Sequence, residues 1–140
     1  FYENPLEGKL YCFSQLFLNK EIWGVDAHSL NASVCNGFTG RGGGIHANLI
    51  ERIFLDGLGG YLEAAKTRLQ LPLPLRISAG LVGVKGYPII FERYRGGLAL
   101  TDHIRWTGEV NSYETPVSEI LEPFFQHLWA ECGEIRHKPQ

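Results

Sequence analysis

Alternating apolar and polar positions near the start of the chain predict a β-hairpin. Aromatic residues alternate with small or polar ones through Lys9–Leu18, and a second alternating run covers Glu21–Ala27. A period of two is typical of strands, because successive side chains point to opposite faces of a sheet. Asn19 and Lys20 stand between the two runs and suit a tight turn.

A second hairpin is predicted over Arg76–Phe91, where two apolar runs flank a turn at Lys85 and Gly86. Glycine readily adopts the positive φ that a tight hairpin needs. Apolar residues occupy both faces of these runs, so we expect the hairpin to be buried on most sides. Gly80 and Gly83 in the first strand indicate a bulge or a close backbone approach.

Two helices are predicted from apolar residues that recur at steps of three or four. The longer helix lies within Ile45–Leu69, and the second lies within Pro116–Cys132. Gly57, Gly59 and Gly60 interrupt the first helix. Because each glycine costs about 1 kcal/mol in a helix interior, we expect a kink or a break there.

The last third of the chain predicts one more strand and the boundaries of the second helix. Ile104–Tyr113 alternates between apolar and polar positions and indicates a strand with one wet face. Thr115 suits the cap of the second helix and Pro116 its first position. Pro123 should kink this helix, and Gly133 suits its C-terminal cap.

The order of these elements, ββαβββα, indicates an α+β domain. Hairpin connections predict a mostly antiparallel five-stranded sheet, against which the two helices bury their apolar faces. This order resembles the topology of profilin-like, longin and roadblock domains, folds that mostly bind partners or small ligands. The residues expected in the core are Phe124, Leu128, Leu121, Ile53 and Leu62.

The composition is that of a globular domain. The chain has 140 residues, of which 44% are hydrophobic and 20% charged, enough to bury a core. A net charge of −2 lacks the basic surplus of a nonspecific nucleic-acid binder, so no direct nucleic-acid binding is expected. No apolar run approaches the ~20 residues of a membrane-spanning helix, so no membrane association is expected.

The start of the chain and its cysteines suggest its origin. The chain begins at Phe1 and contains no Met, so we expect a single domain, 1–140, excised from the C-terminal part of a longer chain, with tails at 1–8 and 134–140. Three cysteines at unrelated spacings favour a reducing compartment over a disulfide framework. We therefore expect a cytoplasmic, bacterial protein.

Three stretches together resemble a family of bacterial proteins. They are SQLFLNKEIWGVDAHSL, YLEAAKTRLQLPLPLRISAGLVGVKGYPI and PVSEILEPFFQHLWAECGEIR, and they cover most of residues 14–136. They resemble the region that follows the AlbA-like, Schlafen-related putative DNA-binding domain, which tends to carry a turn like Gly83–Tyr87 and a terminal helix like Pro123–Gly133. The AlbA-like core is not visible, and the tract Gly40–Gly44 is outside the family's pattern. The resemblance implies an accessory, regulatory domain of a putative DNA-binding or defence-related protein, with no established catalytic residue.

The glycine-dense tract before the first helix is the candidate for anion binding. Its backbone N–H groups, the helix N-terminus and the guanidinium of Arg41 suit an anion such as phosphate. No Lys-Ser or Lys-Thr follows the glycines, so the Walker pattern is absent. A flexible surface loop is the more common interpretation of such a tract. The candidate ligand-binding residues are Arg41, Gly42, Gly43, Gly44 and His46.

No catalytic residue, cofactor site or metal site is predicted. Asp26, His28, His46, Cys12 and Cys35 lack the short ligand repeat of a structural zinc site, so solvated polar residues are the preferred explanation. Cys35 paired with a distant histidine lacks the strand-turn-helix elbow that presents a nucleophile.

Lys85, Tyr87 and Trp23 are the candidates for contact with a partner. Lys85 at the tip of a hairpin suits a phosphate or a carboxylate, although an exposed turn lysine needs no function. Trp23, Trp106 and Trp129 fall on faces with core periodicity. This placement favours a core or a domain interface over base stacking.

Two classes of function remain open. The first is a non-catalytic interaction or regulatory domain that dimerises or senses a ligand, with parent-chain domains, a second copy or a small anionic ligand as partner. The second is a hydrolase that acts on a phosphate-bearing substrate through the glycine tract. The missing catalytic motif favours the first class.

Overall fold

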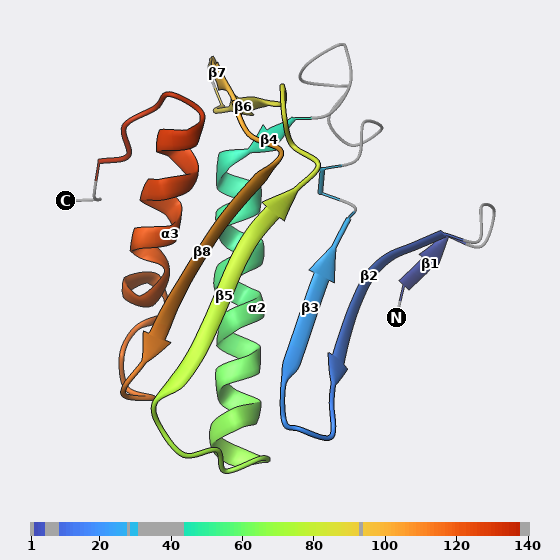
Figure 1. Ribbon diagram of the computed structural model, residues 1–140, viewed down its shortest axis with the longest axis vertical. Helices are drawn as coiled ribbons and strands as arrows, with labels where there is room; N and C mark the ends of the chain where they lie inside the picture. Colours follow the sequence, from blue (N-terminus) through green and yellow to red (C-terminus); the bar gives the residue numbers. More distant parts are fainter. Residues whose placement is uncertain (1, 5–8, 28, 31–43, 93, 138–140) are drawn as a thin grey trace.

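The computed structural model describes residues 2–4, 9–27, 29–30, 44–92 and 94–137 (Figure 1). These residues form two helices, α2 (Ala47–Thr67) and α3 (Val117–Glu131). The strands are β1 (Tyr2–Asn4), β2 (Lys9–Leu16), β3 (Ile22–Asp26), β4 (Ile45–His46), β5 (Leu75–Val82), β6 (Pro88–Ile90), β7 (Arg95–Leu98) and β8 (His103–Val110).

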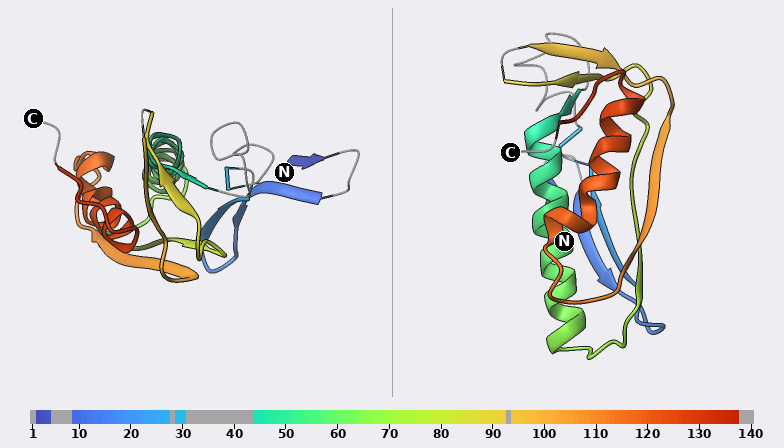
Figure 2. Two further views of the ribbon diagram at one scale, coloured as in Figure 1. Left: turned by 90° about the horizontal axis from the view of Figure 1, so that it is seen from above. Right: turned by 90° about the vertical axis from the view of Figure 1, so that its left-hand side faces the viewer.

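The α+β class is confirmed, but the single five-stranded sheet is wrong. The described strands form three sheets, with the orders β1-β2-β3, β4-β6-β7 and β5-β8. Both helices lie on the same side of the β5–β8 pair (Figure 2). The helices therefore follow the predicted order, while the sheet is divided.

The N-terminal hairpin is confirmed. β2 and β3 are antiparallel, and Lys20 has the positive φ of 69° that closes the turn between them. Gly24 of β3 lies against the ring of Tyr61 from α2, where a Cβ atom would clash. The hydroxyl groups of Tyr61 and Ser14 are 2.7 Å apart and share a hydrogen bond. The hairpin is thus held against α2 at this point.

The Arg76–Phe91 hairpin is wrong in its strand pairing, although its turn is in the predicted place. Gly83 and Gly86 both have a positive φ, at 76° and 80°. Past this turn the chain leaves β5, which pairs instead with all eight residues of β8. β8 offers a much longer partner than the three residues of β6, whose Pro88 has no N–H to donate. β6 pairs with β4 and β7.

Burial of β5 also differs from the prediction. Exposed residues alternate with half-buried ones along the strand, and Leu81 alone is fully buried. β5 therefore has one wet face, whereas all three residues of β6 are buried. Gly80 marks the predicted close approach, because a Cβ atom there would lie 2.5 Å from the carbonyl oxygen of Ile104 on β8.

The expected kink in the first helix is wrong, because α2 is continuous from Ala47 to Thr67. Gly57 and Gly60 face open space, and a Cβ atom at Gly59 would lie 3.9 Å from a Val117 methyl group. Packing of the buried residues on either side of the glycines offsets their low helix propensity, as is usual for protein helices.

The second helix lies within its predicted bounds, but Thr115 does not cap it. The N-cap residue is Pro116, without a side-chain cap, and the helix continues through Pro123. Gly133 has a φ of 76° and ends the helix as predicted. The N–H groups of Gly133 and Glu134 bind the carbonyls of Ala130 and Trp129.

The core lies between the two helices and the β5–β8 pair. Four of the predicted core residues are buried. The exposed fraction is at most 1% for Phe124, Leu121 and Leu128, and it is 9% for Leu62. The ring of Phe124 meets that of Phe54 edge to face at 4.8 Å. Ile53, the fifth expected core residue, is only partly buried. That prediction is wrong, because Ile53 lines a groove on the surface of α2.

Candidate functional site

A groove of about 1670 Å³ is lined by residues of β3, β5 and α2. Both strands run along α2 (Figure 1). The apolar floor comes from α2 and includes Ile53, Leu58 and Tyr61. Small-molecule pockets usually measure about 300–1,000 Å³, so this space is large for one small ligand. Its size and shape suit a segment of polypeptide.

Among the described residues, each strand that borders the groove is paired on one side only. β3 binds β2 and β5 binds β8, and no backbone hydrogen bond joins the facing edges to another described residue. A strand edge of this kind presents a row of backbone donors and acceptors, which can pair with another chain. The groove thus has two pairing edges that face each other.

Exposed apolar side chains flank these edges. Trp23 and Val25 on β3 are 54% and 42% exposed, and Val82 at the end of β5 is 68% exposed. The Trp23 ring makes an edge-to-face contact with Phe17 at 5.8 Å. Trp23 is therefore a surface residue, so of the two predicted placements, a core or a domain interface, the core is excluded and the interface stays a prediction.

The charged groups of the groove do not form a catalytic arrangement among the described residues. Asp26 accepts hydrogen bonds from the N–H and the hydroxyl of Ser29, at 3.0 and 3.1 Å. Glu21 accepts one from the indole N–H of Trp23. Within the described part of the chain, no three His, Cys, Asp or Glu side chains are placed to hold a metal ion.

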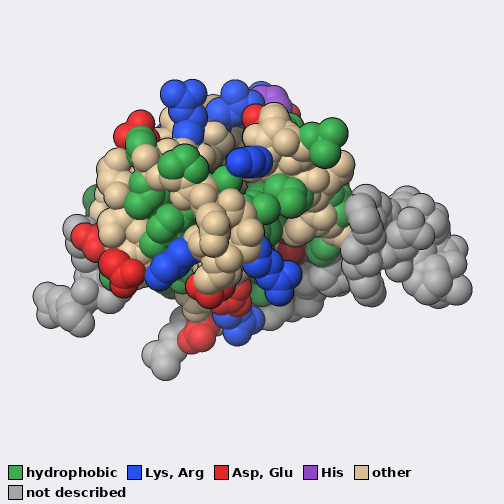
Figure 3. Space-filling view, turned by 90° about the horizontal axis from the view of Figure 1, so that it is seen from below, with side chains coloured by type: hydrophobic (Ala, Val, Ile, Leu, Met, Phe, Trp, Pro, Cys, Tyr) green, Lys and Arg blue, Asp and Glu red, His purple; other side chains and the backbone are tan. Residues whose placement is uncertain are grey.

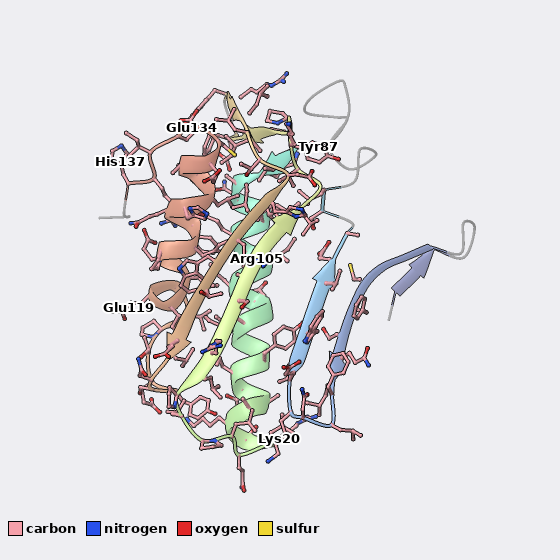
Figure 4. All side chains as sticks on the ribbon, viewed as in Figure 1. Lys20, Tyr87, Arg105, Glu119, Glu134 and His137 are labelled. Carbon is pink, nitrogen blue, oxygen red and sulfur yellow. The ribbon has the colours of Figure 1, made fainter. Side chains whose placement is uncertain are left out.

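Two of the three predicted contact residues line the same groove. Trp23 and the half-buried Tyr87 both line the groove, whereas Lys85 is exposed on the turn outside it. Tyr87 lies near the opposite end of the molecule from Lys20 (Figure 4). On the face seen from below, basic and acidic side chains are interspersed with apolar ones (Figure 3).

The predicted anion site falls largely outside the described residues, which exclude Arg41, Gly42 and Gly43. Gly44 is buried, and His46 precedes the first turn of α2. Burial lowers the pKa of His46 below its usual value, so its ring is neutral at pH 7 and brings no charge to an anion. Anion binding at this tract stays a prediction.

The tightest charge cluster in the described residues lies away from the groove. Arg136 donates from Nε to Glu51 on α2 at 2.6 Å and from a terminal nitrogen to Glu122 on α3. All three side chains are at most 16% exposed. The guanidinium also lies over the rings of Phe125 and Trp129. This arrangement holds the C-terminal segment against both helices.

Among the described cysteines, Cys12 and Cys132 are free thiols. Burial is the main cause that raises the pKa of Cys132 to about 11, with Glu131 and Glu134 adding to it. Its thiol is therefore protonated at neutral pH, which makes it a core residue and not a nucleophile. Of the two described helices, neither is both long and apolar enough to span a membrane.

The sequence did not reveal the groove or the Arg136 cluster. Ile53 belongs to the apolar stripe of α2. Such a stripe predicts that one face of the helix is buried, but it does not show how much of that face other elements cover. Arg136 stood in a short polar tail, while its two partners lie 85 and 14 residues away. No family model, no curated protein and no solved structure matches this chain.

Proposed function

We propose that this chain is a non-catalytic interaction domain that docks a partner polypeptide in the groove between β3 and β5. The observation that carries the proposal is the pair of strand edges, above an apolar floor, to which no other described residue is paired. Edge pairing supplies affinity through backbone hydrogen bonds, and an apolar floor adds burial of side chains. The role agrees with the accessory, regulatory domain that the sequence resemblance implies.

Ile53 is the side chain whose role distinguishes this proposal from a purely structural one. It lines the groove and belongs to none of the three packed clusters of the core. A partner that fills the groove would cover it. Its partial exposure in the free chain is then a property of the docking site, and not a defect of packing.

A selection from a phage-displayed library of random peptides tests the proposal. We expect enriched peptides to bind the whole chain and to lose binding to Ile53→Lys, because the charge lies on the groove floor. Leu100→Lys is the matched control, since Leu100 is 75% exposed and lies outside the groove. Circular dichroism should show both variants folded. Failure to enrich any peptide, or equal loss of binding in both variants, would contradict the proposal.

A further inference from the structure

We infer that the occupant of the groove is one extended segment of another protein, which inserts as a strand between β3 and β5. This inference rests on the proposed docking function and specifies the partner's chemistry. The inserted strand would join the two sheets into one, in the order β1-β2-β3-segment-β5-β8.

The direction of the two bordering strands allows such an insertion. β3 and β5 point the same way along α2 (Figure 1). A strand placed between them therefore meets both neighbours in the same relative orientation, antiparallel or parallel. Successive residues of a strand turn their N–H and C=O groups to opposite sides. One segment thus offers backbone donors and acceptors to both edges.

The apolar floor sets the sequence that the segment needs. Along β5 the side chains alternate between half-buried and exposed, with Ile77 and Ala79 on the inner side and Arg76 and Ser78 on the outer side. A neighbouring strand in the same layer follows the same alternation. The segment should therefore carry apolar residues at every second position. Its paired length should match β3 and β5, which have five and eight residues.

The topology argues against a second copy of this chain as the source. Every described strand already pairs with at least one neighbour, so none has both edges free. Any of these described strands, taken from a second copy, would have to leave its own sheet to fill the groove. A segment without a sheet of its own meets no such cost, which favours an extended stretch of a different protein.

Backbone methylation of a probe peptide tests insertion directly. The probe alternates Val and Thr between terminal Lys residues, is about nine residues long and is added in millimolar excess to the whole chain. Hydrogen exchange followed by mass spectrometry should show slower exchange in both β3 and β5. One modified peptide carries N-methyl groups at its odd positions, and a second carries them at its even positions.

Insertion predicts that each methylated peptide binds at least about tenfold more weakly, because each loses its donors to one of the two neighbours. A methylated peptide that keeps its affinity would show pairing with a single edge and overturn the inference, while the docking function would stand. No protection by the unmodified peptide would also overturn it, whereas failure of the peptide selection would overturn the docking function itself.

The free protein supplies the remaining control. β3 and β5 should exchange at the same rate in concentrated and dilute solutions without peptide. Protection of both strands that appears only at high protein concentration would assign the groove to a second copy and overturn the inference. These measurements need no variant, so they do not depend on whether a substituted chain folds.

Discussion

At the scale of single residues, Arg136 shows how one side chain ties distant segments together. Its guanidinium reaches a carboxylate on each helix while its plane lies over two aromatic rings. A planar fork with several donors suits two carboxylates better than the single ammonium of a lysine. The described residues after Gly133, 134–137, are therefore held to the helices through Arg136.

Replacement of Arg136 should be costly. Arg136→Ala leaves Glu51 and Glu122 shielded from solvent without their common partner, so we expect a loss of about 2–3 kcal/mol in the free energy of unfolding. Arg136→Lys should recover only part of this loss. Chemical denaturation gives these values. Arg105→Ala, a change at an exposed arginine of β8, should stay within about 0.5 kcal/mol. Similar losses at both positions would refute the role of the cluster.

At the scale of elements, the glycines of α2 and β5 have opposite environments. A Cβ atom added at Gly60 of α2 would have no neighbour within 4 Å, whereas one added at Gly80 of β5 would meet a backbone oxygen of β8. The same substitution should therefore have opposite effects in the two elements. The reason is local space, since neither glycine has a positive φ.

We expect Gly60→Ala to raise the free energy of unfolding by about 0.5–1 kcal/mol, because alanine is the better helix former. Gly80→Ala should lower it by about 1–3 kcal/mol, because the new methyl group forces β5 and β8 apart. Thermal and denaturant unfolding measure both changes. A stabilised Gly80→Ala would mean that the two strands are less closely paired than the structure shows.

Local pattern predicts the elements well and their partners poorly. The turn at Lys20, the turn around Gly86 and the burial of Phe124 follow from features within a few residues. The choice of β8 as the partner of β5 depends on residues 21 or more positions further along the chain. Period and turn chemistry do not encode such pairing. Local pattern also does not predict the exposure of Ile53, because this exposure depends on which distant elements cover the face of α2.

At the scale of the whole molecule, Tyr61 joins the N-terminal sheet to the helical layer. Its ring lies against Gly24 and its hydroxyl binds Ser14, so it sets the position of β3 beside the groove. Gly24→Ala should displace the ring and break this hydrogen bond, with a loss of about 1–2 kcal/mol. Unfolding measurements and faster hydrogen exchange in β2 and β3 would show it.

A double-mutant cycle separates this contact from other effects of a new side chain in β3. In a chain that already carries Tyr61→Ala, the ring that opposes a Cβ atom at Gly24 is gone. In that background, Gly24→Ala should lower the free energy of unfolding much less than it does in the original chain. Equal costs in both backgrounds would place the effect elsewhere in the hairpin.

The groove is the feature from which the proposed function follows, and it requires that the facing edges of β3 and β5 be unpaired. Residue-resolved hydrogen exchange of the free chain by NMR measures this most directly. Along each strand, amides directed to β2 or β8 should be protected, and the alternating amides directed to the groove should exchange much faster. Uniform protection along both strands would show that the edges are already paired and would contradict the proposed docking function.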